Sequence, residues 1–195
     1  MTTSDRLRVA LILGSTRTGR FVPTVADWFA DRVRRRRDLE PDRIDLAAVE
    51  LPDQLTDHDE PAPAPVLALG ARLAAADAFV VITPEYNGSF PAAVKNAIDW
   101  FDTEWAGKPV TVVSYGRDTD GARAAAQLRQ VFSELDAVPI RRTVTIARAW
   151  QRFAADGTWP RRDPELDEAV RTALDQLTWW ATALRTARST SPFVA

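Results

Sequence analysis

The chain has 195 residues, a formal net charge of −2 and no cysteine. Hydrophobic residues make up 46% and charged residues 27% of it, proportions typical of a folded globular protein with a substantial core. A sequence without cysteine excludes disulfides, thiolate metal sites and cysteine nucleophiles. The small net charge gives no electrostatic reason to expect a nucleic-acid or membrane partner. The polar N-terminus shows no signal-peptide pattern and no apolar run approaches bilayer length, so we expect a cytoplasmic protein.

Strand and helix patterns alternate along the chain without a long linker or an internal repeat. The apolar runs predict strands at 6–13, 44–48, 79–83, 109–114 and 140–146. The helical patterns cover 22–37, 66–76, 91–101, 122–135 and 165–188, with a proline-rich loop at 51–65. This alternation indicates one α/β domain over residues 1–195, a doubly wound five-stranded parallel sheet with helices on both faces. Ligands of such sheets bind at the carboxyl ends of the strands.

The loop at 14–20 joins the first strand to the first helix and is the first candidate site. Unpaired backbone N–H groups and the helix dipole converge at such a junction, which favours an anion. Ser15, Thr16 and Thr18 add hydroxyl donors, and Arg17 can bind two phosphate oxygens. The loop therefore predicts a phosphate site, and the alternative is an ordinary strand-to-helix turn.

The same loop lacks the motifs that bind larger nucleotides. No Gly-x-Gly occurs in the chain, so the dinucleotide fingerprint is missing. Gly14 and Gly19 match the glycines of the nucleotide-triphosphate loop, but Arg20 and Phe21 stand where that motif has lysine and a hydroxyl. A monophosphate held without a metal fits this pattern better.

Two more polar loops follow buried strands and would share the same sheet edge. Their residues are Thr83, Pro84, Glu85, Tyr86, Asn87, Gly88 and Ser89 after the third strand, and Ser114, Tyr115, Gly116 and Arg117 after the fourth. Tyr86 can lie against a flat ring while Asn87, Gly88 and backbone N–H groups bond to ring carbonyls. The alternative for 84–88 is a plain turn, because proline, asparagine and glycine are common turn residues.

Three segments together resemble the NADPH-dependent FMN reductase family, over roughly residues 6–146. They are Gly14-Ser15-Thr16-Arg17-Thr18-Gly19-Arg20, Pro84-Glu85-Tyr86-Asn87-Gly88-Ser89-Phe90-Pro91 and Lys95-Asn96-Ala97-Ile98-Asp99-Trp100. That family includes flavin, quinone, azo-dye and chromate reductases. The resemblance implies a flavodoxin-like fold, bound FMN, NADPH or NADH as co-substrate and a small-molecule electron acceptor.

By matching position, the resemblance also implies which residues bind FMN. They are Gly14, Ser15, Thr16, Arg17, Thr18, Arg20, Phe21, Val22, Pro84, Glu85, Tyr86, Asn87, Gly88, Ser114, Tyr115 and Gly116. Ser15 and Arg17 would bind the phosphate, and residues 84–88 would line the isoalloxazine with Tyr86 beside the ring. Lys95 and Asn96 would hold the following helix and its loop in place.

The chain departs from the family pattern at two places. Many members have a serine and a second polar residue where this chain has Arg20 and Val22, so a charged contact would replace a neutral one. The loop after the fourth strand is often glycine-rich, whereas here it reads Arg117-Asp118-Thr119-Asp120-Gly121. The pocket shape at that edge, and with it the choice of substrate, is therefore open.

Three function classes are open. One is an enzyme that passes hydride from NAD(P)H through FMN to a quinone, free flavin or azo compound, with no catalytic side chain and no metal, because the flavin carries the chemistry. Another is a flavodoxin-type electron carrier that binds FMN without oxidising NAD(P)H, but such carriers are strongly acidic, unlike this chain. The third is a scaffold without flavin. The resemblance further implies a homodimer or a tetramer.

The remaining conspicuous residues have structural explanations. The arginine run at 34–37 closes a helix, where cations complement the dipole, and His58 lies in a solvated acidic loop rather than at a metal site.

Two groups of aromatic residues are expected to have packing roles. Trp179 and Trp180 would pack against the sheet. Trp100, Phe101 and Trp105 would belong to the core or to a subunit interface.

Overall fold

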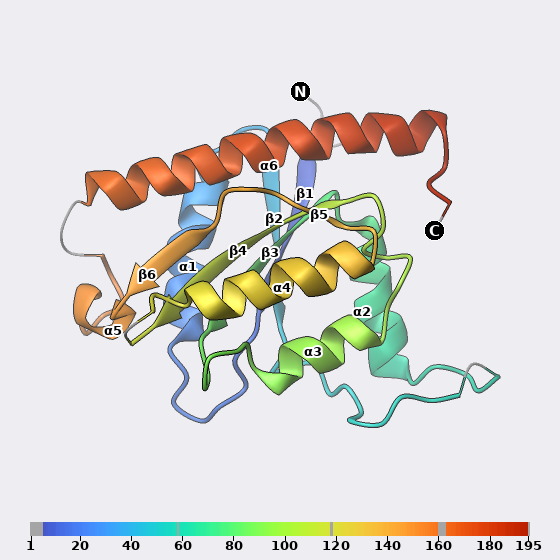
Figure 1. Ribbon diagram of the computed structural model, residues 1–195, viewed down its shortest axis with the longest axis horizontal. Coiled ribbons are helices and arrows are strands. Elements are labelled where there is room, and N and C mark those ends of the chain that lie inside the picture. The colour runs from blue at the N-terminus through green and yellow to red at the C-terminus, as the bar shows by residue number, and fades with distance from the viewer. Residues whose placement is uncertain (1–5, 58, 118, 160–162, 195) are drawn as a thin grey trace.

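The structure is a computed structural model that describes residues 6–57, 59–117, 119–159 and 163–194. Its strands are β1 (Leu7–Leu13), β2 (Leu39–Asp45), β3 (Ala78–Pro84), β4 (Pro109–Gly116), β5 (Val138–Pro139) and β6 (Val144–Ala147) (Figure 1). Its helices are α1 (Val22–Arg34), α2 (Ala64–Ala75), α3 (Ala92–Asp99), α4 (Ala122–Glu134), α5 (Ala149–Arg152) and α6 (Pro164–Thr190).

The strands form one parallel sheet in the order β2-β1-β3-β4-β5, with β6 also paired to β4. β5 pairs with the start of β4 at Pro109 and Val110, and β6 pairs with its end from Val113 to Gly116. The two short strands thus share one position beside β4. The resulting order 2-1-3-4-5 is that of flavodoxin-like doubly wound folds, which confirms the expected fold class.

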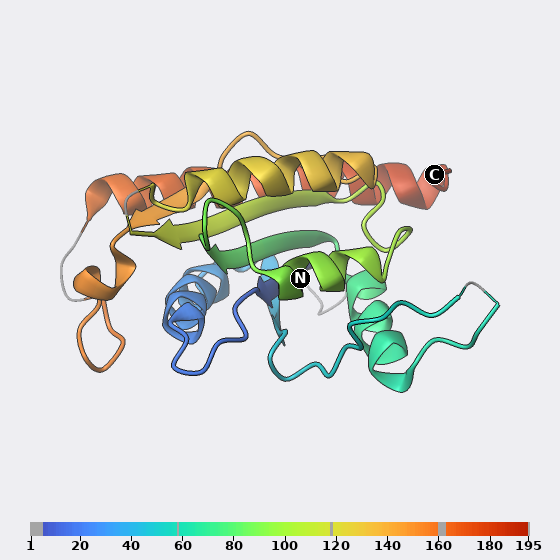
Figure 2. The same ribbon diagram turned by 60° about the horizontal axis from the view of Figure 1, so that its bottom comes forward.

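Helices cover both faces of the sheet (Figure 2). α1 and α6 pack on one face with strand residues such as Leu11 and Val80. α2, α3 and α4 pack on the other face with residues such as Ile12 and Val81. Because successive side chains of a strand point to opposite faces and both faces are covered, the central strands carry continuous apolar runs, such as 9–13 of β1 and 78–82 of β3. These continuous runs made the central strands predictable.

The second strand and the last strand differ from their expected bounds. β2 begins at Leu39 rather than at residue 44, since it pairs with β1 from Leu7 onward. It lies at the sheet edge and is only partly buried, so it has no apolar run. Of the expected strand at 140–146 only the end is a strand, as part of β6, and β5 lies just before the expected range. Between β5 and β6 the Thr111 hydroxyl donates to the carbonyl oxygen of Arg142 at 2.7 Å. At this point a hydrogen bond from a side chain takes the place of the backbone hydrogen bonds that join neighbouring strands.

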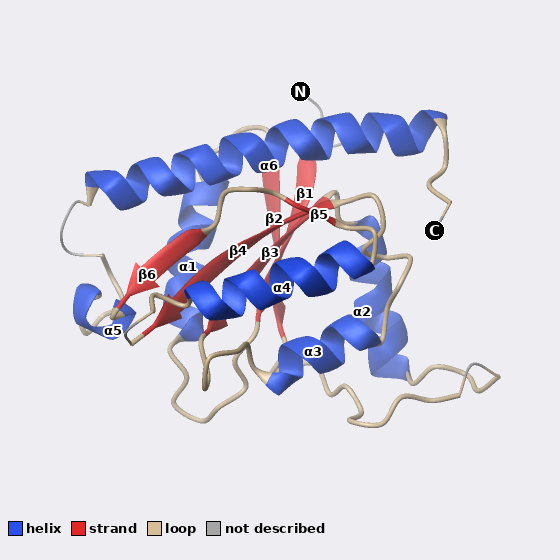
Figure 3. Cartoon of the chain, viewed as in Figure 1, coloured by secondary structure: helices blue, strands red, loops and turns tan. Residues whose placement is uncertain are grey.

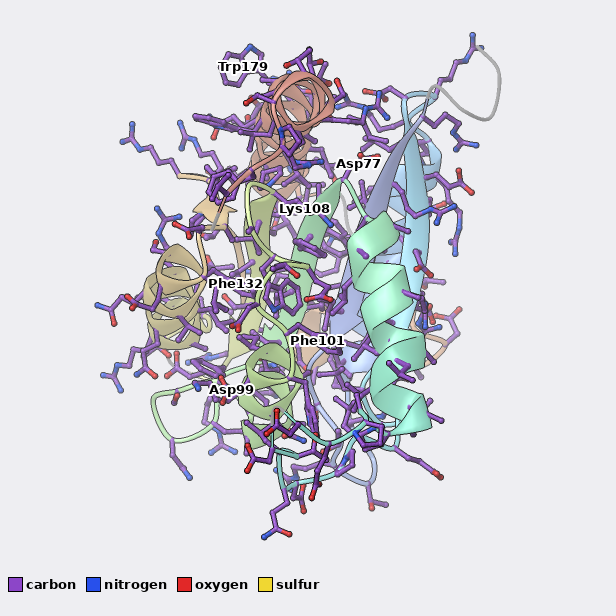
Figure 4. The ribbon with its side chains drawn as sticks, turned by 90° about the vertical axis from the view of Figure 1, so that its right-hand side faces the viewer. Asp77, Asp99, Phe101, Lys108, Phe132 and Trp179 are labelled. Carbon is purple, nitrogen blue, oxygen red and sulfur yellow. The ribbon has the colours of Figure 1, made fainter. Side chains whose placement is uncertain are left out.

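Aromatic residues from the loop after α3, from β3 and from α4 fill the core beneath α2, α3 and α4. Trp105 is 1% exposed, and its ring centroid lies 4.7 Å from that of Phe79 and 5.4 Å from that of Phe132. Phe101 is also buried in this layer (Figure 4). Phe101 and Trp105 are therefore core residues, the first of the two roles expected for them. Trp100 is partly buried against the same cluster.

The expectation that Trp179 and Trp180 pack against the sheet is also wrong. Their side chains are 64% and 36% exposed, and Figure 4 shows Trp179 on the outward side of α6. The helical period explains this, because the buried stripe of α6 runs through Val170, Leu174 and Leu177. The two indoles contact each other edge to face, with ring centroids 5.0 Å apart.

A charged network around Asp77, the residue before β3, covers the amino edge of the sheet. By this edge we mean the end at which its parallel strands begin. Its Oδ2 accepts a hydrogen bond from the backbone N–H of Arg8 at 2.9 Å. Two arginines of α6, Arg185 and Arg188, approach the same carboxylate at 3.5 and 3.8 Å. This network ties the C-terminal half of α6 to the two central strands.

Lys108, just before β4, is buried close to this network (Figure 4). Its Nζ donates to the carbonyl oxygens of Leu73 and Ala74, each at 2.9 Å. These carbonyls belong to the last turn of α2, where i+4 donors of the helix run out, and that of Leu73 also accepts from the N–H of the C-cap residue Ala76 at 3.1 Å. Lys108 therefore caps α2 from inside the protein.

Candidate functional site

The loop after β1 begins where the backbone passes close to α3. The N–H of Gly14 donates to the carbonyl oxygen of Ile82 at 2.9 Å. A Cβ on Gly14 would lie 2.5 Å from Cγ2 of Val94, so only glycine fits without a shift. The ends of β1 and β3 are thereby held side by side, and the loops that follow them emerge at one end of the sheet with α5 (Figure 3).

Backbone donors are concentrated in this loop. Among the described residues, the N–H groups of Thr16, Thr18 and Gly19 make no backbone hydrogen bond. α1 begins directly afterwards at Val22 without a side-chain cap, so the positive end of its dipole faces the loop. Within the described chain, Arg17 has no ion-pair partner, and its guanidinium carbon lies 5.7 Å from the ring centroid of Tyr86. Such groups are the donors that an anion site requires.

A hydrogen bond joins the first loop to the second. The hydroxyls of Ser15 and Tyr86 are 2.8 Å apart, and Ser15 is 1% exposed. Tyr86 and Ser89 exchange two backbone hydrogen bonds across Asn87 and Gly88, whose φ angles are 52° and 80°. Two positive φ angles in a two-residue hairpin are typical of a type I′ turn, for which Asn-Gly is the favoured sequence. Residues 84–88 thus form a turn, and this turn also places Tyr86 at the candidate site. The two interpretations of this segment are therefore compatible.

The third loop is packed tightly beneath the second. Ser114 and Tyr115 are buried, and the carbonyl oxygen of Tyr115 accepts a hydrogen bond from the N–H of Glu85 at 2.9 Å. A Cβ on Gly121 would lie 2.5 Å from the Cβ of Ser114, so this loop also requires glycine. Burial raises the pKa of the Tyr115 hydroxyl.

Two of the expected FMN residues have other partners. Arg20 pairs with Asp45 at the end of β2, with Nη2 2.8 Å from Oδ2, and its Nη1 donates to the carbonyl oxygen of Ser15 at 3.0 Å. The hydrogen bond to Asp45 raises the pKa of Arg20. Burial opposes the ionisation of Asp45, but its hydrogen bonds with Arg20 and Ala47 lower the pKa overall. Val22 is fully buried in the core.

The three loops surround a cavity of about 360 Å³, a size usual for small-molecule sites. It is lined by Arg17, Thr18, Gly19, Arg20, Phe21, Pro84, Glu85, Tyr86, Tyr115, Gly116, Arg117 and Trp150. Nine of these residues were expected from the sequence, since Gly19, Arg117 and Trp150 were not among the assigned FMN contacts. Trp150 comes from α5, a short helix that the sequence patterns did not predict.

The other expected residues lie outside the lining of this cavity. Thr16 borders a second cavity, of about 710 Å³, between residues 46–53 and α3. The remaining six, which hold or border the loops, are Gly14, Ser15, Val22, Asn87, Gly88 and Ser114. Lys95 is bound to Asp99 at 2.5 and 2.6 Å, and Asn96 donates to the carbonyl oxygen of Pro52 at 3.1 Å. The first contact lies within α3, and the second joins α3 to the loop at Pro52.

The described part of the chain shows no group of three or more His, Cys, Asp or Glu side chains that could hold a metal ion. His58, expected in a solvated loop, and Asp118, in the loop of undetermined role, lie outside the described residues. No described helix has both the length and the apolar character needed to cross a membrane.

The donor set of the cavity fits a flavin mononucleotide. Free loop N–H groups and the unpaired Arg17 suit a monophosphate, and the ring of Tyr86 beside them suits a flat heterocycle. Fold and site together define a flavodoxin-like α/β protein with a mononucleotide site at the carboxyl edge of its sheet.

Comparisons with known proteins lead to the same class. The family model of the NADPH-dependent FMN reductases matches residues 7–151. An NAD(P)H-dependent FMN reductase of Schizosaccharomyces pombe is 34% identical over 154 residues, which cover 72% of this chain and 74% of the relative. A quinone reductase of Escherichia coli K12 is 33% identical over 186 residues, covering 92% and 94%.

A solved structure agrees with these relatives. The flavoenzyme NAD(P)H:(acceptor) oxidoreductase of Paracoccus denitrificans superimposes with a TM-score of 0.72 at 26% identity, covering 91% of this chain and 98% of the other. The chain belongs to the NADPH-dependent FMN reductase family. It is therefore an oxidoreductase that uses FMN and NAD(P)H.

Proposed function

We propose that the chain oxidises NAD(P)H through FMN held in the cavity of the three loops and reduces a quinone. One molecule of NAD(P)H, one quinone and one proton give NAD(P)⁺ and a hydroquinone. FMN, when bound, supplies the redox chemistry, since it takes hydride from a nicotinamide and passes electrons on. The observation that carries the proposal is the 2.8 Å bond between Ser15 and Tyr86, which couples the anion-binding loop to the ring-lining hairpin. The quinone reductase relative supports the choice of acceptor.

Each loop has a distinct task in this proposal. Arg17 and the N–H groups of the first loop bind the phosphate, and Arg20 positions that loop through Asp45. Tyr86 presents its ring to the isoalloxazine from a hairpin held at both ends. The carboxylate of Glu85 accepts a hydrogen bond from the N–H of Arg123 in the first turn of α4, which fixes the hairpin base.

No catalytic side chain is assigned in this proposal. The protein binds and orients the cofactor and excludes water. Because NAD(P)H and quinone use the same cavity in turn, we expect ping-pong kinetics with parallel double-reciprocal plots.

The test combines flavin binding with steady-state oxidation of NADPH and of NADH in the presence of 1,4-benzoquinone. We expect FMN to bind more tightly than riboflavin, since riboflavin lacks the phosphate, and oxidation to require FMN. Equal affinities for FMN and riboflavin would contradict the phosphate site. FMN binding without oxidation of either coenzyme would identify an electron carrier instead, and a protein that binds no flavin would be a scaffold.

Further features extend the proposal beyond the cavity. We infer from family membership that the chain forms a homodimer or a tetramer in the cytoplasm, with a small-molecule acceptor and without nucleic-acid or membrane partners. Phe101 and Trp105 cannot provide the contact surface, because both are buried within one chain. Light scattering after size-exclusion chromatography checks the oligomeric state, and a monomer at micromolar concentration would contradict it.

A further inference from the structure

Trp150 has no role in the function proposed above, although it lines the cavity. Its side chain is 44% exposed, and among the described residues it makes no hydrogen bond and no aromatic contact. The indoles of Trp28, Trp105 and Trp159, by contrast, pack against other aromatic rings. An aromatic side chain that faces a cavity without a partner in the protein is available to a ligand.

The backbone that carries Trp150 is held on both sides. Before it, Arg148 takes a left-handed conformation at φ 48°, and its N–H donates to the carbonyl oxygen of Gly116 at 3.0 Å. After it, the buried ring of Phe153 lies 5.4 Å from the ring of Phe21, which also lines the cavity. α5 is thus attached to the end of β4 and to the first loop, and it presents Trp150 from a fixed position.

We infer that Trp150 is a positioning residue for the acceptor, which it binds by stacking on the planar quinone ring. This inference rests on the proposed function and names the residue that selects its second substrate. The face of an indole is electron-rich and an oxidised quinone is electron-poor, so the two stack favourably. The hydroquinone product and the dihydronicotinamide of NAD(P)H are both electron-rich. Trp150 therefore favours the oxidised acceptor and releases the product.

Trp150→Ala, Trp150→Phe and Trp179→Ala form the test set, each loaded with FMN. Trp179 is the matched control, because it is an exposed tryptophan on the outward side of α6. We expect Trp150→Ala to raise the KM for 1,4-naphthoquinone by about 3- to 10-fold, the range of one aromatic stacking contact. Trp150→Phe should stay within about 2-fold of the wild-type protein, since it keeps an aromatic face.

Two further measurements separate acceptor binding from a general defect. Ferricyanide, which is not planar and needs no stacking, should be reduced with kcat/KM changed less than about 2-fold by Trp150→Ala. Equilibrium dialysis of naphthoquinone against the oxidised protein, without NAD(P)H, should show the same loss of affinity in the absence of turnover.

Three results would overturn the inference: an unchanged naphthoquinone affinity in Trp150→Ala, a loss of FMN affinity in that variant, or a slower reduction by NADPH in stopped flow with an unchanged quinone KM. The second would make Trp150 a flavin contact, and the third a nicotinamide contact. Failure of the proposed function can be distinguished from failure of this inference, since the wild-type protein itself would then not oxidise NAD(P)H. Dialysis still decides the role of Trp150 in that case.

Discussion

Polar groups at the amino edge and at the carboxyl edge of the sheet differ in whether they have partners within the protein. At the amino edge, the Asp77 carboxylate and the Lys108 ammonium are both bound to protein groups. At the carboxyl edge, N–H groups of the first loop and the guanidinium of Arg17 have no such partners among the described residues. Thr16, Arg17, Thr18 and Gly19 are exposed, so their donors are open to an anion that binds from solution at the helix N-terminus. One sheet thus has a closed edge for stability and an open edge for binding.

The substitution with the largest expected effect is in the core, and it lowers the stability of the protein. Trp105→Ala removes a ring that is 1% exposed, so we expect a loss of about 3–5 kcal/mol in the free energy of unfolding by urea. FMN affinity of the folded protein should not change. Trp179→Ala, on the exposed side of α6, should stay within about 0.5 kcal/mol. A similar loss in both variants would contradict the assigned core.

A smaller effect separates two glycines of the open edge, which both have positive φ. A Cβ on Gly121 would lie 2.7 Å from the backbone nitrogen of Tyr115, whereas a Cβ on Gly19 would meet nothing within 4 Å. We expect Gly121→Ala to cost about 2–4 kcal/mol of unfolding free energy, since steric overlap adds to the backbone strain. Gly19→Ala should cost about 1 kcal/mol, the strain alone. Equal losses would show that the loop after β4 can shift freely.

A third prediction concerns ligand affinity at the two edges. Arg17→Ala should weaken FMN binding by about 1.5–3 kcal/mol, because a charge-assisted hydrogen bond to phosphate is lost. The affinity for riboflavin should stay the same. Arg185→Ala, which removes an arginine of the closed edge, serves as control and should leave FMN affinity unchanged. An unaltered FMN affinity in Arg17→Ala, measured by fluorescence quenching, would remove Arg17 from the phosphate site.

The last prediction is a pH dependence of the unfolding free energy that arises at the closed edge. Burial lowers the pKa of Lys108 from 10.5 to about 8, with a further contribution from Arg188. Between these values the unfolded chain binds more protons, so the unfolding free energy rises with pH across that window. The hydrogen bonds to α2 persist, since a neutral amine still donates.

Lys108→Met isolates this contribution, because every other titrating group is shared. The unfolding free energy of the wild-type protein relative to Lys108→Met should increase from about pH 8 to about pH 10. A difference that stays constant over this range would show that Lys108 titrates alike in the folded and unfolded chain.

The sequence alone was sufficient for the central strands and for the loops that follow them. The central strands are buried on both faces, so their apolar runs are continuous and local in the chain. The hairpin at Asn87 and Gly88 was equally visible, because a tight turn depends on the backbone preferences of its own residues.

Only the tertiary structure decided the features that depend on distant partners. β2 is defined by pairing with β1, and Arg20 is directed to Asp45, which lies 25 residues further along. Trp179 is exposed because the burial of α6 depends on which of its faces meets the sheet. Trp150 reaches the cavity because the N–H of Arg148 bonds to Gly116. Local propensity cannot encode such contacts, since each is set by where another part of the chain has folded.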